Sequence, residues 1–243
     1  MGKGLLLTRP AGFNDALTVA CRQQGIPSFE APLIKIVPCS TPLIEPRFAQ
    51  PEAGQVQIYT SRNAVMFADP VILANARRPE VRVFGVGSAT ASQLKNLGID
   101  AIAPQKPGSE ALLELPFFKQ IRNLQVTLVT GLGGRELLET TLRDRGATVV
   151  RVACYAREKV IRPDLDQIVS TRGFDHILIT SVDLLAGLTA NLGGPLISSV
   201  TLCVTAPRIA SAAVDQGYQR IISAEDASSD RIVSALADII WSR

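Results

Sequence analysis

The chain has 243 residues, of which 47% are hydrophobic and 19% are charged, and its formal net charge at pH 7 is +3. This length suffices for one large domain or two small ones with a substantial core. No uninterrupted apolar segment approaches the roughly 20 residues of a membrane helix, and no signal peptide is recognisable, so we expect a cytoplasmic protein without membrane contact. The small net charge gives no argument for nucleic-acid binding.

In chain order, short apolar runs alternate with amphipathic segments of helical period. The predicted strands cover 4–8, 57–60, 81–86, 126–130, 147–155, 176–180 and 201–205, with a further short extended segment at 28–37. Nearly every strand is followed by a small or hydroxyl-bearing residue and then by a helix. This alternation predicts an α/β protein with parallel sheets.

Three segments of the first half recur in the second half at nearly one offset. The aligned pairs are Gly25 with Gly146, Ser61 with Ser181 and Gly98 with Gly217, which are 121, 120 and 119 positions apart. Such a repeat predicts two similar α/β domains of about 120 residues each, divided near residue 120. A pair of this kind usually binds its ligand in a cleft between the domains.

The cysteine and histidine content disfavours metal chemistry and a Ser/His/Asp triad. Cys21, Cys39, Cys154 and Cys203 lie too far apart for a CxxC metal pair, so we expect buried free thiols. His176 is the only histidine and is expected at the start of a strand.

Six strand-to-helix loops are small, hydroxyl-bearing or rich in glycine. They are Thr8–Pro10, Thr60–Asn63, Gly87–Thr90, Thr130–Gly134, Thr180–Ser181 and Thr205–Arg208, with Arg9, Arg62, Arg135 and Arg208 within or beside them. N-capping explains any single loop. Together, helix N-termini and arginines favour a site for an anion with several carboxylates.

The stretch VTLVTGLGGREL at 126–137 raises the alternative of a nucleotide site, because a glycine-rich turn joins a strand to a helix. In the dinucleotide pattern GxGxxG, however, Glu136 takes the third glycine position, where its carboxylate would repel a pyrophosphate. Arg151 could suit a phosphorylated ribose, so an NADP-dependent reductase stays a third alternative. The glycines otherwise indicate close approach of backbone to a ligand, or a tight turn.

The order of motifs resembles the uroporphyrinogen-III synthase family. The motifs are LLLTRP at 5–10, PLIKI at 32–36, TSRNAV at 60–65, VGSATASQL at 86–94, GLGGRELLETTLRDRGATV at 131–149, CYAR at 154–157, TS at 180–181 and APRIASAAVDQGY at 206–218. The resemblance implies two α/β domains joined by a two-stranded linker, with the ligand cleft between them. It implies one domain from 1–36 plus 158–243, the other from 40–153, and linker strands at 35–39 and 154–158, in place of a division near residue 120.

The resemblance also implies a lyase of tetrapyrrole (haem) biosynthesis that needs no cofactor or metal. Such an enzyme closes the linear tetrapyrrole hydroxymethylbilane to uroporphyrinogen III, with loss of water and inversion of ring D through a spiro intermediate. Tyr155 matches the family's linker tyrosine and is expected to assist the leaving hydroxyl. The implied substrate contacts are Thr8, Arg9, Ser61, Arg62, Asn63, Ser88, Thr90, Gly131, Gly133, Gly134, Ser181 and Arg208.

Two residues depart from the family pattern. Ile209 stands at the second-half equivalent of Thr90, and Leu132 stands where a polar residue is common, so contact by that loop is expected through main-chain amides. The alternative function is a non-catalytic two-domain protein that binds a small polycarboxylate. The only partner expected is the small-molecule substrate, and without coiled-coil heptads or a long apolar tail we expect a monomer.

Overall fold

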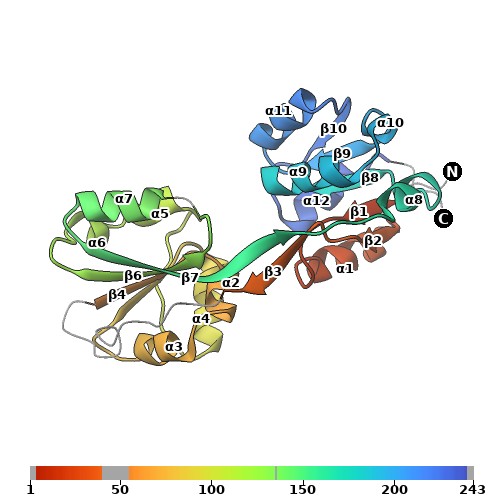
Figure 1. The fold of residues 1–243 in the computed structure, drawn as a ribbon. Helices are drawn as coiled ribbons and strands as arrows, with labels where there is room; N and C mark the ends of the chain where they lie inside the picture. The colour runs from red at the N-terminus through yellow and green to blue at the C-terminus, as the bar shows by residue number, and fades with distance from the viewer. Residues whose placement is uncertain (1–3, 40–54, 135, 240–243) are drawn as a thin grey trace. The chain divides into compact units, whose positions relative to one another are not determined.

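The computed structural model describes residues 4–39, 55–134 and 136–239. The chain divides into two compact units. Unit 1 combines the residues up to Lys35 with those from Glu158 onward, and unit 2 runs from Ile36 to Arg157. Each unit is built on one five-stranded sheet with helices on both faces (Figure 1).

The unit 2 sheet has the strand order β3 (Ile34–Pro38), β7 (Thr148–Lys159), β6 (Gln125–Gly131), β4 (Gln55–Tyr59) and β5 (Arg82–Gly85). The pairs β7–β6, β6–β4 and β4–β5 are parallel. Side chains alternate along each strand: Val56 and Ile58 pack on one face, and Tyr59 on the other.

Two sets of helices cover the two faces of this sheet. The helices α2 (Arg62–Met66), α3 (Pro70–Ala76) and α4 (Ser88–Asn96) share a core with Tyr59. The helices α5 (Ser109–Leu113), α6 (Pro116–Lys119) and α7 (Leu137–Asp144) cover the opposite face (Figure 1). The sheet is therefore apolar on both sides, as parallel sheets require.

The unit 1 sheet is parallel, in the order β10 (Arg220–Ser223), β9 (Thr201–Val204), β8 (His176–Ile179), β1 (Leu5–Leu7) and β2 (Ser28–Glu30). The helices α1 (Asp15–Gln23) and α12 (Ser229–Ala235) pack on one face. Figure 1 shows α9 (Val182–Asn191) and α11 (Pro207–Asp215) on the other face; α8 (Leu165–Ser170) and α10 (Gly194–Ile197) complete the unit.

The predicted repeat is present in the geometry. Gly25 and Gly146 have φ values of 69° and 86°, and Gly98 and Gly217 have 73° and 90°, so each pair ends a helix in the left-handed conformation that favours glycine. The strands correspond as well, because β2-β1-β8-β9 in unit 1 follows the same order as β7-β6-β4-β5 in unit 2. Each unit thus holds the first part of one repeat and the second part of the other.

The predicted fold class, α/β with two parallel-dominated sheets, is confirmed. All seven predicted strands occur, with ends that differ by up to four residues, and the segment 28–37 divides into β2 and β3. The strand β10 was not predicted. A division near residue 120 is wrong, because β6 lies beside β4 in the same sheet. In the part of the chain that the structure describes, no helix is long and apolar enough to cross a membrane.

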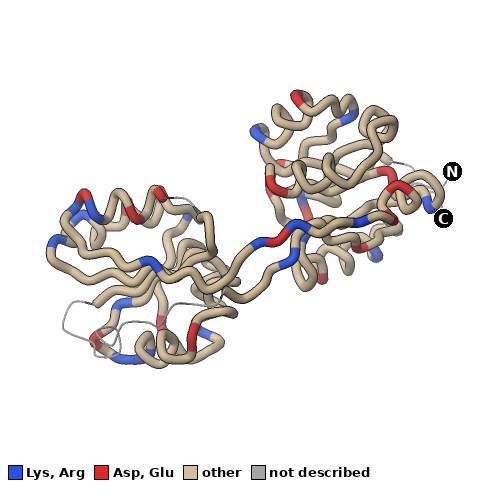
Figure 2. The backbone as a smooth tube through the Cα atoms, in the orientation of Figure 1, with Lys and Arg blue, Asp and Glu red and all other residues tan. Residues whose placement is uncertain are grey.

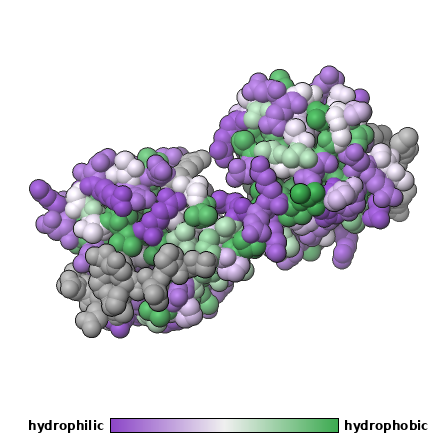
Figure 3. Space-filling model, in the orientation of Figure 1, coloured by the Kyte–Doolittle hydropathy of each residue, from purple (hydrophilic) through white to green (hydrophobic). Residues whose placement is uncertain are grey.

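Charge and hydropathy are evenly mixed over each unit. Basic and acidic residues are interspersed along the described backbone of both units (Figure 2). The face drawn in Figure 3 likewise combines polar and apolar side chains over each unit. Polar side chains gather at the carboxyl ends of the strands, where Thr8 and Thr60 follow β1 and β4 and Thr130 is the penultimate residue of β6.

Candidate active site

The loops after β4 and β6 lie side by side in unit 2, because parallel strands place their carboxyl ends at one edge of the sheet. The Thr60 N–H donates to the Val129 carbonyl at 3.0 Å, and the Thr60 hydroxyl donates to the Thr130 hydroxyl at 3.1 Å. This edge brings together most of the predicted contact residues of unit 2.

Ser61 lies two residues after the end of β4 and directly precedes α2. Its backbone is extended (φ −165°, ψ 167°), and its Oγ accepts a hydrogen bond from the Ala64 N–H at 3.1 Å, so it is the N-cap of that helix. The same Oγ lies 3.0 Å from the phenol oxygen of Tyr155. Ser61 is therefore both a helix cap and a partner of the predicted catalytic tyrosine.

Tyr155 is buried, with 2% of its surface exposed, and it contacts residues from both loops at this edge. Its backbone carbonyl accepts from the Leu132 N–H at 2.8 Å, and the centre of its ring lies 6.3 Å from the centre of the Phe67 ring. A Cβ on Gly131 would lie only 2.6 Å from the Tyr155 ring, so no side chain fits at position 131. This glycine is required by close approach of the tyrosine ring to its backbone, and not by a left-handed turn.

A register shift in β7 sets the direction of the Tyr155 side chain. Thr130 pairs with Ala153, whereas Gly131 pairs with Tyr155, so one residue of β7 is passed over. Strict alternation would send the side chains of Cys154 and Tyr155 to opposite faces. Because of the shift, both pack in the core shared with α2 and α4.

Arg157 contacts the phenol from two positions further along β7. Its Nη2 donates to the Tyr155 oxygen at 3.3 Å, and its guanidinium carbon lies 5.5 Å from the centre of the Tyr155 ring. The phenol thus has a neutral hydroxyl on one side and a cation on the other.

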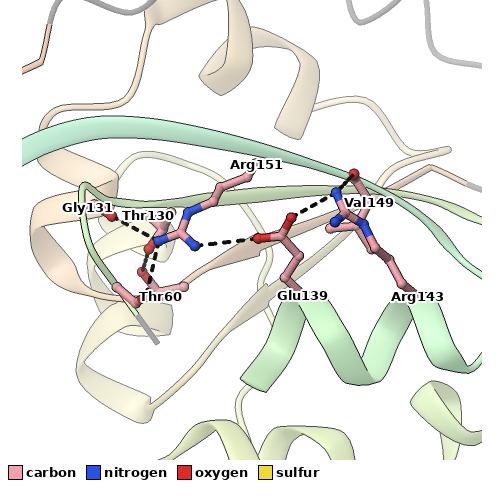
Figure 4. Close-up of polar contacts among 8 residues, drawn as sticks. Thr60, Thr130, Gly131, Glu139, Arg143, Val149 and Arg151 are labelled. Atoms are coloured by element: carbon pink, nitrogen blue, oxygen red, sulfur yellow. Dashed lines mark hydrogen bonds and ion pairs between the residues drawn. The ribbon is translucent and has the colours of Figure 1, made fainter. Parts of the chain in front are cut away.

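The glycine-rich loop after β6 is tied to β7 and α7 by Arg151 (Figure 4). The Arg151 guanidinium donates to the Gly134 carbonyl at 3.2 Å and to the Gly131 carbonyl at 3.5 Å. Its Nη1 lies 3.4 Å from the Glu139 carboxylate, which also pairs with Arg143 at 2.8 Å. Arg151 therefore holds two loop carbonyls inward, while the Leu132 N–H of the same loop is engaged by the Tyr155 carbonyl.

The tip of this loop is open. Leu132 and Gly133 are exposed, and Gly133 has φ 71°, which favours glycine. A Cβ on Gly134 would lie 3.0 Å from the Thr130 hydroxyl and 3.2 Å from Arg151, so Gly134 is confined by the same contacts. Arg135 lies outside the described residues.

The turn into α4 shows the two predicted hydroxyls in different settings. Ser88 is exposed at the first helical position, whereas Thr90 is buried, with its Cβ 3.2 Å from an ideal Cβ on Gly85. In α2, Arg62 is exposed and Asn63 is 8% exposed. Ser88 and Arg62 are thus accessible to a ligand, while Thr90 and Asn63 mainly pack.

Four predicted residues belong to unit 1, at the ends of three adjacent strands. The Thr8 hydroxyl donates to the Leu178 carbonyl, and Arg9 donates to the Ala227 carbonyl at 2.8 Å. Ser181 is the N-cap of α9 and accepts from the Leu184 N–H at 3.2 Å, in the same way as Ser61 in α2. Arg208 is exposed in the first turn of α11.

The four cysteines and His176 are engaged in contacts within the fold. All four cysteines are free; Cys21, Cys154 and Cys203 are buried as predicted, and Cys39 is half-buried. Burial raises the pKa of the Cys154 thiol to about 11, and this neutral thiol donates to the Thr130 carbonyl at 3.3 Å. His176 begins β8, with Nδ1 2.8 Å from Asp175. Within residues 4–39, 55–134 and 136–239 no group of three potential metal ligands occurs.

Comparison with known proteins decides the family. The model of a family described as "Uroporphyrinogen-III synthase HemD" matches residues 15–234. The uroporphyrinogen-III synthase of Salmonella typhimurium is 31% identical over 96% of this chain and 99% of its own length. That of Proteus mirabilis is 35% identical over 63% of this chain and 79% of its own.

The chain belongs to the uroporphyrinogen-III synthase family. The predicted resemblance is thereby confirmed, and with it the enzyme class, a lyase of haem biosynthesis that acts on a small molecule. Solved structures agree on the fold. The synthase of Helicobacter pylori has a TM-score of 0.61 at 15% identity, over 96% of this chain and 97% of its own. A mutant synthase of Thermus thermophilus has a TM-score of 0.59 at 18% identity, over 96% of both chains.

Of the two departures from the family pattern, Ile209 has a structural explanation and Leu132 has none. Ile209 is buried in α11, as its equivalent Thr90 is in α4, so this position faces inward in both units. Leu132 is 63% exposed, and the loop carries no polar side chain there. Contact through main-chain N–H groups thus stays the expectation for this loop.

Sequence reasoning did not assign a role in the site to Arg157, and it considered Arg151 only for a nucleotide. The sequence could have indicated Arg157, because it lies two positions after Tyr155 and side chains two positions apart on a strand point to the same side. No local signal identifies Arg151, whose partners Gly131 and Glu139 come from a neighbouring strand and a helix.

Proposed function

We propose that this chain cyclises hydroxymethylbilane to uroporphyrinogen III and that Tyr155 is the residue that assists loss of the hydroxyl group. The observation that carries the proposal is the phenol of Tyr155, buried at the edge of the sheet between the Ser61 hydroxyl and the Arg157 guanidinium. A phenol so placed is held in one orientation, as proton donation to a leaving hydroxyl requires.

Apart from this proton donation, the reaction requires few catalytic groups from the protein. Loss of water from ring A gives an azafulvene cation, which ring D attacks at its substituted carbon to form the spiro intermediate. Fragmentation and reclosure then invert ring D. Because the intermediates are strong electrophiles, the main task is to fold the bilane so that the substituted carbon, not the free one, reaches the cation.

The substrate carries eight carboxylates, and several groups in each unit suit them. In unit 2 these are the exposed Arg62, Ser88 and the loop Gly131–Gly134, whose carbonyls are engaged by Arg151. In unit 1 we assign Arg9, Ser181 and Arg208 to the same task, because they follow adjacent strands. Thr8 is fully buried and supports this loop through its hydrogen bond to the Leu178 carbonyl. Asn63 and Thr90 are buried, so within the proposed set they support these loops and do not contact a carboxylate directly.

The two alternatives have less support. An NADP-dependent reductase relied on Arg151, but its guanidinium is committed to two carbonyls and Glu139. A non-catalytic binding protein would have no use for a buried phenol beside a cation. We retain the domain ranges 1–36 with 158–243 and 40–153, the linker strands, the cytoplasmic location, the monomeric state and the absence of a nucleic-acid partner as proposals.

The test supplies hydroxymethylbilane generated in situ and separates the oxidised uroporphyrins by chromatography. We expect isomer III to predominate with the protein and isomer I without it. An excess of isomer I at high protein concentration would overturn the assignment.

A further inference from the structure

We propose that Arg157 is a positioning residue that stabilises the conjugate base of Tyr155 while the proton is away from the phenol. The proposal rests on the proposed function, because it concerns the same proton transfer. It adds to the mechanism a cation, Arg157, that supports the reaction through Tyr155 and does not itself contact the bilane.

The geometry ties Arg157 to the phenol oxygen. Residues 155 and 157 are two apart on β7, so their side chains leave the strand on one side. The Nη2 donor is 3.3 Å from the phenol oxygen, while Tyr155 is buried and Arg157 is exposed. The charge can therefore stay hydrated on its outer side while it stabilises a buried oxygen.

A count of hydrogens shows that the cluster has one proton to give. Ser61 and Tyr155 together carry two hydroxyl hydrogens, and the contact between them uses one. The other two contacts, from the Ala64 N–H and from Arg157, bring their own hydrogens. One O–H thus remains for a ligand, on Tyr155 if Ser61 donates to the phenol, or on Ser61 if Tyr155 donates to the serine.

In both arrangements the negative charge ends on the phenol oxygen of Tyr155. As the C–O bond of the bilane breaks, its oxygen takes the remaining hydroxyl proton and leaves as water. If that proton came from Ser61, the serine is reprotonated by Tyr155, so the electron pair stays on the phenol oxygen either way. When ring D is restored to an aromatic pyrrole, a carbon-bound proton is released and the tyrosinate takes it up, which closes the cycle.

The tyrosinate would be a buried anion, and such an anion needs a countercharge. Arg157 is the cation that the structure places on the phenol oxygen. The thiol of Cys154, the preceding residue, stays neutral because burial raises its pKa to about 11. Arg157 therefore lowers the energy of the state in which the proton has left.

The experiment compares kcat and KM of Arg157→Gln, Arg157→Lys and Lys159→Gln, each with Tyr155 and with Tyr155→Phe. We expect Arg157→Gln to lower kcat by about tenfold with KM within about twofold, and Arg157→Lys to restore most of the rate because it keeps the charge. In the Tyr155→Phe background we expect Arg157→Gln to change kcat by less than about twofold, since the oxygen it acts on is gone.

Lys159→Gln is the matched control, because Lys159 is an exposed cation two further positions along β7. It should keep the wild-type kcat. An Arg157→Gln variant with wild-type kcat, with a raised KM alone, or with the same loss in both backgrounds would overturn the inference. Formation of isomer I by every variant, wild type included, would instead refute the proposed function.

Discussion

The hydroxyl of Ser61 and the phenol of Tyr155 lie 3.0 Å apart although 94 positions separate them in the chain. Ser61 follows β4 and Tyr155 lies in β7, with β6 between these strands. The contact is possible because the tyrosine side chain crosses above Gly131, which has no Cβ to obstruct it. This relationship gives the first three predictions.

Replacing Tyr155 with Phe removes the proposed acid and keeps the ring that fills the core. We expect kcat to fall by roughly 100-fold while isomer III stays the main enzymatic product, because folding of the bilane does not require the hydroxyl. Steady-state kinetics with product separation measure both. A Tyr155→Phe variant with full rate would remove Tyr155 from the mechanism and leave the family assignment intact.

Replacing Ser61 with Ala removes a helix cap and a partner of the phenol. We expect a loss of about 1 kcal/mol in the free energy of unfolding from the cap, and a lower kcat from the misplaced phenol. Asp69→Ala is the control, because Asp69 caps α3 by accepting from the Val71 N–H at 2.8 Å. It should lose similar stability in urea unfolding and keep kcat; an equal loss of kcat in both variants would assign the effect of Ser61 to capping alone.

Replacing Gly131 with Ala forces a Cβ to within 2.6 Å of the Tyr155 ring. We expect kcat to fall at least as far as in Tyr155→Phe, because the ring must move, and overpacking to lower the free energy of unfolding by about 1–3 kcal/mol. Gly4→Ala is the control with a comparable steric clash, since its Cβ would lie 2.5 Å from the Phe174 ring in unit 1. It should be destabilised with kcat retained, as measured by calorimetry and kinetics on the same preparations.

Replacing Arg151 with Gln releases the carbonyls of Gly131 and Gly134 and leaves Glu139 with Arg143 as its partner. We expect KM to rise by roughly tenfold, because an unfixed loop binds carboxylates less well, with a smaller change in kcat. Arg145→Gln is the control: Arg145 also donates to two carbonyls, those of Leu113 and Phe118, at 2.7 and 3.0 Å. A rise in KM in both variants would point to general loosening of unit 2.

Alkaline pH should destabilise unit 1 through a buried thiol. Burial raises the pKa of Cys203 from 9.0 to about 12. The folded state therefore keeps a proton that the unfolded state loses, so this stability is complete below about pH 9 and is lost as the pH rises toward 12. At pH 10 the expected loss for this thiol is about 1.4 kcal/mol.

Urea unfolding at pH 7 and pH 10 measures this effect. Cys203→Ala should reduce the difference in unfolding free energy between pH 7 and pH 10 by about 1.4 kcal/mol, although it lowers stability at pH 7 by creating a cavity. Val204→Ala creates a cavity at the next buried position of β9 and keeps the thiol, so it should keep the wild-type difference. An unchanged difference in Cys203→Ala would show that other groups cause the alkaline loss.

Local sequence patterns were enough to predict most helices and strands and to recognise the family. The seven predicted strands form because β-branched and aliphatic runs alternate with amphipathic helices, and both signals are local in the chain. The aligned glycines that end α1, α4, α7 and α11 could be recognised because a left-handed helix end favours glycine wherever it occurs. The strand β10, with the short sequence RIIS at 220–223, was missed because four residues at a sheet edge carry little periodicity.

The sequence by itself determined the α/β class and the list of polar loops, because both depend on neighbours within about ten residues. It also determined the repeat, because similar segments recur about 120 positions apart. How the repeats are shared between two sheets does not follow from the repeat itself, since strand pairing joins residues far apart in the chain; the family resemblance implied it, and the strand order of the two sheets decides it. The tertiary structure alone decided the direction of Tyr155. Alternation along β7 predicts the opposite face, and only the register shift against Gly131 turns the phenol toward Ser61, because that shift is fixed by pairing with another strand.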